Sequence, residues 1–171
     1  MPDAGHRPSA PRFYRLSPLV IGLSYCALTL GGAQALTVPM TGWSAKDSSH
    51  STWADSAGAC VLKEESLPQP YPSFSTAEAA RAFALKVQGA LLGQNEGGQK
   101  LQAVITQPVD RAGKWTVMAS YLFTSQEVQY RATQLYLSDQ GKLRTVTGSS
   151  ADGEASRCVG QMREFLRYLA D

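Results

Sequence analysis

The strand expected over residues 115–124 limits the fold more than any other feature, because both of its faces are apolar. Trp115, Val117 and Tyr121 alternate along one face, while Met118 and Leu122 lie on the other. Such a sheet has to be covered on both sides, and the chain offers two helices with one apolar stripe each. We therefore expect an α+β domain in which an antiparallel β-sheet is flanked by two helices, an α/β/α sandwich.

A four-stranded antiparallel meander is expected over about residues 100–148, because the loops between its strands are too short for crossovers. In the third of these strands the apolar pattern shifts between Ala132 and Leu135, which predicts a bulge or a strong bend. Shorter strands are expected nearer the N-terminus. They are an edge strand over Leu36–Trp43 broken by Pro39, and strands over residues 52–55 and 58–65.

The first helix is expected over about residues 75–92, introduced by a capping box formed by Ser75 and Glu78. Just before it, residues 66–73 contain three prolines and are expected to form an extended linker, in which Tyr71 is exposed. The second helix is expected over about residues 154–169. Its apolar stripe contains Cys158, Met162, Phe165 and Leu169, and its arginines Arg157, Arg163 and Arg167 are expected to face solvent.

Residues 1–35 have the three-part pattern of a secretory signal peptide. Three arginines precede an uncharged stretch from Leu16 to Leu30, and Ala33-Gln34-Ala35 forms an A-x-A cleavage site, so cleavage is expected after Ala35. The apolar stretch is shorter than the roughly 20 residues that span a bilayer, although an uncleaved anchor is the alternative. We expect a secreted or periplasmic domain over residues 36–171, without a stable membrane span after cleavage.

Charge argues against nucleic acid as a partner. The chain has 16 basic and 14 acidic residues, of which the signal contains Arg7, Arg12, Arg15 and Asp3. Thirteen of each sign remain in the exported domain, and no run of Lys or Arg occurs anywhere.

Two cysteines remain after cleavage, Cys60 and Cys158, and an even count in an oxidising compartment predicts one disulfide. Closing a loop of this length stabilises a domain by roughly 4–5 kcal/mol in the chain-entropy model. The exported domain has no C-x-x-C motif and a single histidine, His50. A structural clasp is therefore favoured over a redox or metal pair, and no metal or cofactor is expected.

The order of elements and three local motifs resemble the PsbP-like fold family (the Mog, PsbP and DcrB proteins) over residues 36–171. Val38-Pro39-Met40-Thr41-Gly42-Trp43 is close to the V-P-x-G-W of those chains, with one extra residue. The helix start Ser75–Glu78 and the Tyr130–Leu143 stretch, with its Gly-containing turn, also match. The Arg157-Cys158 pair at the last helix departs from the pattern. The resemblance implies a binding or assembly role and no shared catalytic residues.

Few residues could form a catalytic site. His50 lies in a serine-rich loop beside Asp47 and Asp55, which is the composition of a Ser-His-Asp triad, but no G-x-S-x-G motif occurs. Glu64 and Glu65 are a poor carboxylate pair, because neighbours on a strand point to opposite faces. Asp152 with Glu154 forms a second pair, and Gly97-Gly98 lacks the spacing of a phosphate loop. No catalytic residue is expected.

The sequence thus predicts an exported, non-catalytic binding or accessory protein of the cell envelope, whose partner is another envelope or secreted protein. One alternative is an inhibitor or immunity protein against an envelope-acting enzyme, with residues 94–99 or the Pro-rich segment as a protruding loop. Others are a small-ligand carrier with a closed apolar pocket and an enzyme with dispersed carboxylates. Aromatic residues that could mark a binding surface are Trp43, Trp53, Tyr121, Tyr130 and Tyr136.

Overall fold

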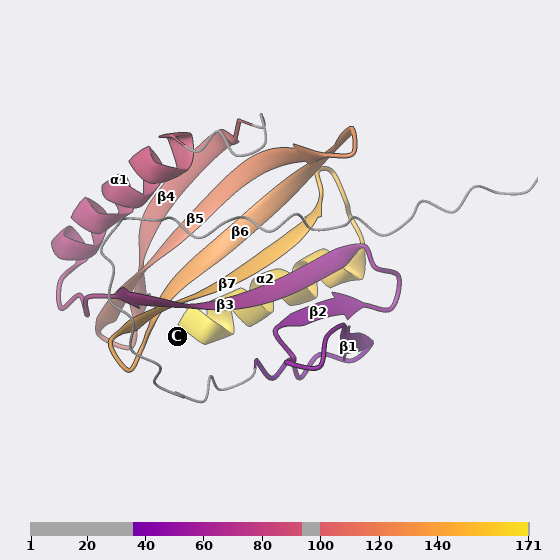
Figure 1. Ribbon diagram of the computed structural model, residues 1–171, viewed down its shortest axis with the longest axis horizontal. Coiled ribbons are helices and arrows are strands. Elements are labelled where there is room, and N and C mark those ends of the chain that lie inside the picture. The colour runs from indigo at the N-terminus through magenta and orange to yellow at the C-terminus, as the bar shows by residue number, and fades with distance from the viewer. Residues whose placement is uncertain (1–35, 94–99, 171) are drawn as a thin grey trace, which may run out of the picture.

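A computed structural model describes residues 36–93 and 100–170 (Figure 1). One seven-stranded antiparallel sheet has the strand order β1-β2-β3-β7-β6-β5-β4, and two helices complete an α+β fold, the expected class. The strands are β1 (Trp43–Ala45), β2 (Thr52–Asp55), β3 (Cys60–Pro70), β4 (Gln102–Arg111), β5 (Lys114–Ser125), β6 (Val128–Asp139) and β7 (Lys142–Ala151). The helices are α1 (Ala77–Gly93) and α2 (Arg157–Ala170).

The two helices lie on opposite faces of the sheet. In Figure 1, α1 lies over β4 at one end of the sheet, and α2 lies behind β3 and β7. Val117 and Tyr121 of β5 belong to the core beneath α1, while Met118 packs into the core beneath α2. The two apolar sides of β5 therefore face two separate cores, which is why its sequence is apolar on both alternating sets.

A bulge or a strong bend was expected in β6, and the bulge is absent because β6 pairs in continuous register with both β5 and β7. Ala132 and Tyr136 face the α1 side, whereas Leu135 and Leu137 face the α2 side. The shift in apolar pattern marks the point along β6 where the α2 core begins. A register shift does occur in β4, between Gln102 and Ile105.

The N-terminal strand prediction over residues 36–43 is wrong. Residues 36–40 form no strand, and β1 begins only at Trp43. Leu36 and Val38 are nevertheless buried in the α2 core, so the segment is fixed by its side chains instead of a strand ladder. Pro39 lacks the N–H that a ladder would need there.

The expected linker over residues 66–73 is strand in its first part, because β3 continues to Pro70. β2 pairs with only the first part of β3, up to Lys63, whereas β7 pairs along β3 as far as Pro70. Pro68 and Pro70 lie where one side of β3 has no neighbouring strand. A proline is tolerated at such an edge since no donor is required.

The cap of α1 is Thr76 instead of the predicted Ser75. The Ala79 amide donates to Thr76 Oγ1 at 3.2 Å, which satisfies one free N–H of the first turn. At the start of α2, the Ser156 amide donates to Glu154 Oε1 at 2.8 Å. Both helices therefore begin two or three residues later than predicted: Thr76 caps α1, and the Glu154–Ser156 bond fixes the turn just before α2.

α2 packs closely on β7 at a position where β7 carries a glycine. A Cβ atom placed on Gly148 would lie 2.7 Å from Cγ and Sδ of Met162, so only glycine allows this approach. The predicted stripe is confirmed for Cys158, Met162 and Phe165, which are buried in the α2 core. Neither described helix is long and apolar enough to cross a membrane.

Candidate functional site

Cys60 and Cys158 form the disulfide that the sequence predicts, with an Sγ–Sγ distance of 2.14 Å and a Cα–Cα distance of 6.0 Å. Cys60 opens β3 and Cys158 lies in the first turn of α2, so the bond ties the helix to the sheet. Asp55 supports the turn leading into Cys60, since its carboxylate accepts the Cys60 amide at 2.8 Å and the Ala57 amide at 3.1 Å.

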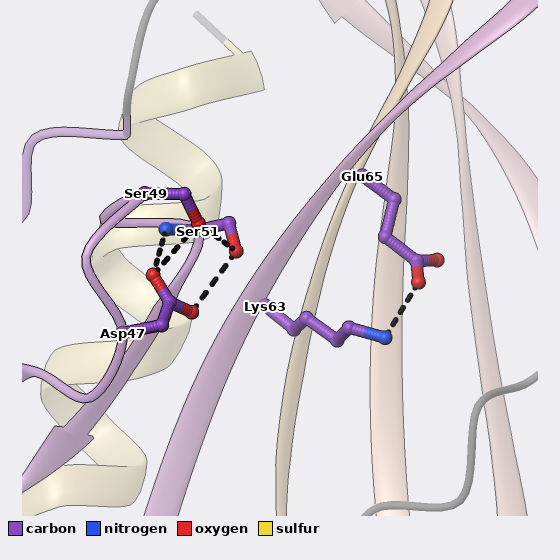
Figure 2. A network of polar contacts seen from close by, with 5 residues as sticks. All are labelled: Asp47, Ser49, Ser51, Lys63 and Glu65. Carbon is purple, nitrogen blue, oxygen red and sulfur yellow. Dashed lines mark hydrogen bonds and ion pairs between the residues drawn. The ribbon is translucent and has the colours of Figure 1, made fainter.

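The serine-rich loop is held by Asp47 and does not assemble a triad (Figure 2). The Asp47 carboxylate accepts hydrogen bonds directly from Ser49 Oγ at 2.9 Å and from Ser51 Oγ at 3.0 Å. The His50 ring lies beside Trp53, at 6.0 Å between centroids, and does not stand between the carboxylate and a serine. Partial burial would raise the pKa of Asp47, but hydrogen bonds from Thr52, Ser51 and Ser49 outweigh it and hold that pKa well below its usual range.

Glu64 and Glu65 point to opposite faces, as predicted for strand neighbours. Glu64 is buried on the α2 side and forms an ion pair with Arg144 of β7. Glu65 lies on the α1 side and accepts from Lys63 Nζ at 2.5 Å. The second candidate carboxylate pair is also divided, because Asp152 pairs with Arg131 at 3.0 Å while Glu154 caps α2.

A polar surface lies on the α1 side of the sheet, next to that helix. α1 is packed over β4 and β5, and within residues 36–93 and 100–170 the same face of β7 and β3 has no helix packed on it. Figure 2 shows Lys63 and Glu65 projecting on the same side of β3. We call this surface the open sheet face. Its partly exposed residues are Lys63 and Glu65 of β3, Thr147 of β7 and Gln134 of β6, and the buried residues Thr145, Ser149 and Tyr136 lie between them.

Register places these side chains in rows across three strands. One row runs from Glu65 through Thr145 to Tyr136. The next runs from Lys63 through Thr147 to Gln134. Directly opposed side chains of this kind lie within contact distance, so the rows form one continuous polar surface.

The hydrogen-bonding capacity of the open sheet face is only partly used. Tyr136 donates to Gln134 Oε1 at 2.8 Å. Thr145 is 2 % exposed, and its Oγ1 has no hydrogen-bond partner within the described chain. Burial, reinforced by the charge of Glu65, raises the pKa of Tyr121 to about 12, so this neighbouring phenol stays protonated. A buried hydroxyl without a hydrogen-bond partner is unfavourable.

Two hollows of very different size are present on the described surface. A pocket of about 110 Å³ is lined by Val61, Ser149 and Tyr130 at one end of the open sheet face. A groove of about 940 Å³ runs along the outer side of α2, between Met40 and Tyr168. The larger hollow lies outside the helix, whereas a small-ligand carrier would need a closed pocket between helix and sheet.

Most aromatic candidates are core residues. Trp43 is buried and donates to Gln161 Oε1 at 3.3 Å, and Trp53 donates to the His50 carbonyl at 2.9 Å. The exposure expected for Tyr71 is wrong, because its ring packs edge-on against Phe74 and Phe83. The Pro-rich segment therefore folds inward after Pro70 and does not protrude.

Other predictions have mixed outcomes. Arg157, Arg163 and Arg167 are exposed, as expected. The predicted loop at residues 94–99, with Gly97-Gly98, and the signal peptide with its cleavage residue Ala35 lie outside the described residues. Tyr136 and Glu65 were singled out from the sequence, whereas five residues of the open sheet face were not: Lys63, Gln134, Thr145, Thr147 and Ser149. The sequence signal that could have identified those of β7 is the alternation of polar residues 145, 147 and 149 with Val146 and Gly148, which indicates a strand with one polar face.

No family model matches the sequence, and no curated protein matches it either.

Proposed function

We propose that the chain is an exported, non-catalytic binding or accessory protein of the cell envelope, and that it contacts another envelope or secreted protein through the open sheet face. The observation that carries the proposal is the polar surface of β3, β7 and β6, which lies beside a helix-covered region of the same sheet. The disulfide between Cys60 and Cys158 supports an oxidising compartment.

The composition of the open sheet face suits a partner that binds reversibly. Non-obligate interfaces are about as polar as the rest of a protein surface, and tyrosine is enriched in them. Lys63 and Glu65 are each about one-third exposed and neutralise one another, so they add specificity without a large net charge.

A binding experiment on the purified exported protein tests this role. The protein is immobilised, incubated with its own envelope fraction, and the retained protein is identified and then purified for titration calorimetry. Thr147→Arg places a long charged side chain in the centre of the open sheet face. We expect it to weaken binding by about tenfold or more, because a buried unpaired charge at an interface typically costs several kcal/mol.

The matched control is Gln107→Arg, which adds the same side chain at an exposed position of β4. Gln107→Arg should bind as tightly as the unaltered chain, and both variants should have unchanged melting temperatures. Equal affinity for the two variants would reject the open sheet face as the contact surface. Retention of no specific protein would reject the binding role itself.

A further inference from the structure

A third side chain completes a cluster around the disulfide. Asp55, Cys60 and Cys158 each present one ligand atom, and these three atoms lie within 4.8 Å of one another. Cys60 and Cys158 are buried, while Asp55 is partly exposed at the β2–β3 turn. Two sulfurs and one carboxylate oxygen are a donor set that zinc and related thiophilic divalent metals accept.

Each member of the cluster is held by structure that does not depend on the S–S bond. Cys60 is paired with Ser150 in the β3–β7 ladder, and Cys158 is carried by α2, which packs on Gly148 through Met162. Asp55 is fixed by the amides of Ala57 and Cys60. Breaking the disulfide should therefore leave both thiols close together beside the carboxylate.

The spacing after reduction suits tetrahedral coordination. A zinc–sulfur distance of about 2.3 Å with a tetrahedral angle separates two sulfurs by about 3.8 Å. A Cα–Cα distance of 6.0 Å allows that separation through side-chain rotation alone. Cys158 lies in the first turn of α2, where the positive end of the helix favours a thiolate, the form that binds metal.

We propose that Asp55, Cys60 and Cys158 form a reduction-dependent binding site for a thiophilic divalent metal of the zinc class, which fastens α2 to β3 when the disulfide is broken. A dithiol reductant supplies two electrons and two protons, is itself oxidised to a disulfide, and converts the S–S bond into two thiols. Metal binding then releases both thiol protons to water. Two thiolates and the Asp55 carboxylate are the protein ligands, and a water molecule occupies the fourth position.

The test uses the purified exported protein, residues 36–171, in which Cys60 and Cys158 are the two cysteines. It is reduced with a trialkylphosphine that is then removed under anaerobic conditions. Co²⁺ is the probe, because tetrahedral cobalt–thiolate coordination has a strong visible and ultraviolet absorption. We expect one Co²⁺ per chain with this absorption, displaced by Zn²⁺. The unreduced protein and the Cys60→Ser/Cys158→Ser variant should lack it.

Asp55→Asn separates the proposed three-ligand site from a simple pair of thiols. We expect the variant to bind Co²⁺ about tenfold or more weakly, since even an outer-shell partner typically contributes that much. Asp139→Asn, at the end of β6, is the control and should bind as the unaltered chain does. Equal affinity for Asp55→Asn and the unaltered chain would overturn the site as proposed.

Circular dichroism provides a second readout if the reduced chain loses structure. Zn²⁺ should restore the helical signal of the reduced protein, and it should not do so in the Cys60→Ser/Cys158→Ser variant. Failure of Zn²⁺ to restore the signal, or octahedral cobalt spectra throughout, would contradict the proposal. These readouts do not depend on a partner protein, so they are independent of the proposed function.

Discussion

At the residue scale, the carboxylate of Asp47 connects one end of the β1–β2 loop to the other. It accepts the Ser51 amide at 2.9 Å together with the hydroxyls of Ser49 and Ser51. Each of these bonds is stronger to the ionised carboxylate than to the neutral acid, so together they stabilise the charged form and lower the pKa of Asp47 in the folded state.

Asp47→Asn should therefore change how stability depends on pH. A carboxyl whose folded pKa lies below its unfolded value of about 3.9 contributes stability that is fully present above that value. The contribution is lost as the pH falls toward the folded pKa. Urea unfolding should show the variant less stable at pH 7, with the difference shrinking below about pH 4. A difference that stays constant from pH 7 to pH 2 would contradict this assignment.

Gly148 tests the contact between β7 and α2. Gly148→Ala places a Cβ against Met162, and overpacking of this kind typically destabilises by about 1–3 kcal/mol. Gly160→Ala is the matched control, because Gly160 lies inside α2 with open space around it. It should stabilise the chain by about 0.5–1 kcal/mol, since alanine favours helix. Thermal unfolding of the two variants measures the difference between their stabilities. Gly148→Ala combined with Met162→Ala is measured as the rescue.

At the element scale, the sheet is divided into faces with different chemistry, and β3 shows this best. Its residues Glu64 and Glu65 are neighbours in sequence, yet one is buried beneath α2 and the other lies on the open sheet face. The paired cations also differ, since Arg144 is 20 % exposed and Lys63 is 32 % exposed. The contribution of each ion pair to the free energy of unfolding depends on its burial and not on its position in the sequence.

Two neighbouring substitutions should therefore have unequal effects. Glu64→Gln leaves Arg144 without its partner, and we expect a loss of about 2–3 kcal/mol, below the full cost for a buried pair because Arg144 is partly exposed. Glu65→Gln removes an exposed pair and should cost less than about 1 kcal/mol. Chemical denaturation of both variants at neutral pH gives the two values. Similar losses of stability in the two variants would mean that the buried pair contributes no more than the exposed pair.

Elements with a strong local signal could be predicted from the sequence, and those decided by distant contacts could not. The alternation in residues 115–124 predicted a sheet covered on both sides, and β5 faces two cores. The break of pattern in β6 was misread as a bulge, because a single strand does not reveal where a helix begins to cover it. Tyr71 was misplaced because the ring contacts with Phe74 and Phe83 arise only when α1 packs on the sheet.

The candidate site was predicted less well than the fold. The pairing of Cys60 with Cys158 needed only a count of cysteines, whereas the open sheet face needed the register of three strands. Thr145, Thr147 and Gln134 are ordinary polar residues in sequence. They come together only because β7 pairs with both β3 and β6, and one helix and three strands separate β3 from β7 in the sequence.

At the scale of the whole molecule, one layered domain presents two surfaces of different character. The α2 side is closed by the disulfide, by the Glu64–Arg144 pair and by the close approach at Gly148. The α1 side is closed over β4 and β5 and polar over β7 and β3. Lys63, Thr147 and Gln134 are partly exposed on that polar area, which is the arrangement that the proposed binding role requires.

Site-specific photocross-linking in the producing cells tests whether the open sheet face binds a partner. A photoreactive residue is placed at Thr147 or Gln134 on the open sheet face, and at Gln107 on β4 as the control. We expect a discrete cross-linked species with one envelope or secreted protein from the first two positions and none from Gln107. No adduct from Thr147 or Gln134, or the same adducts from all three positions, would contradict this expectation.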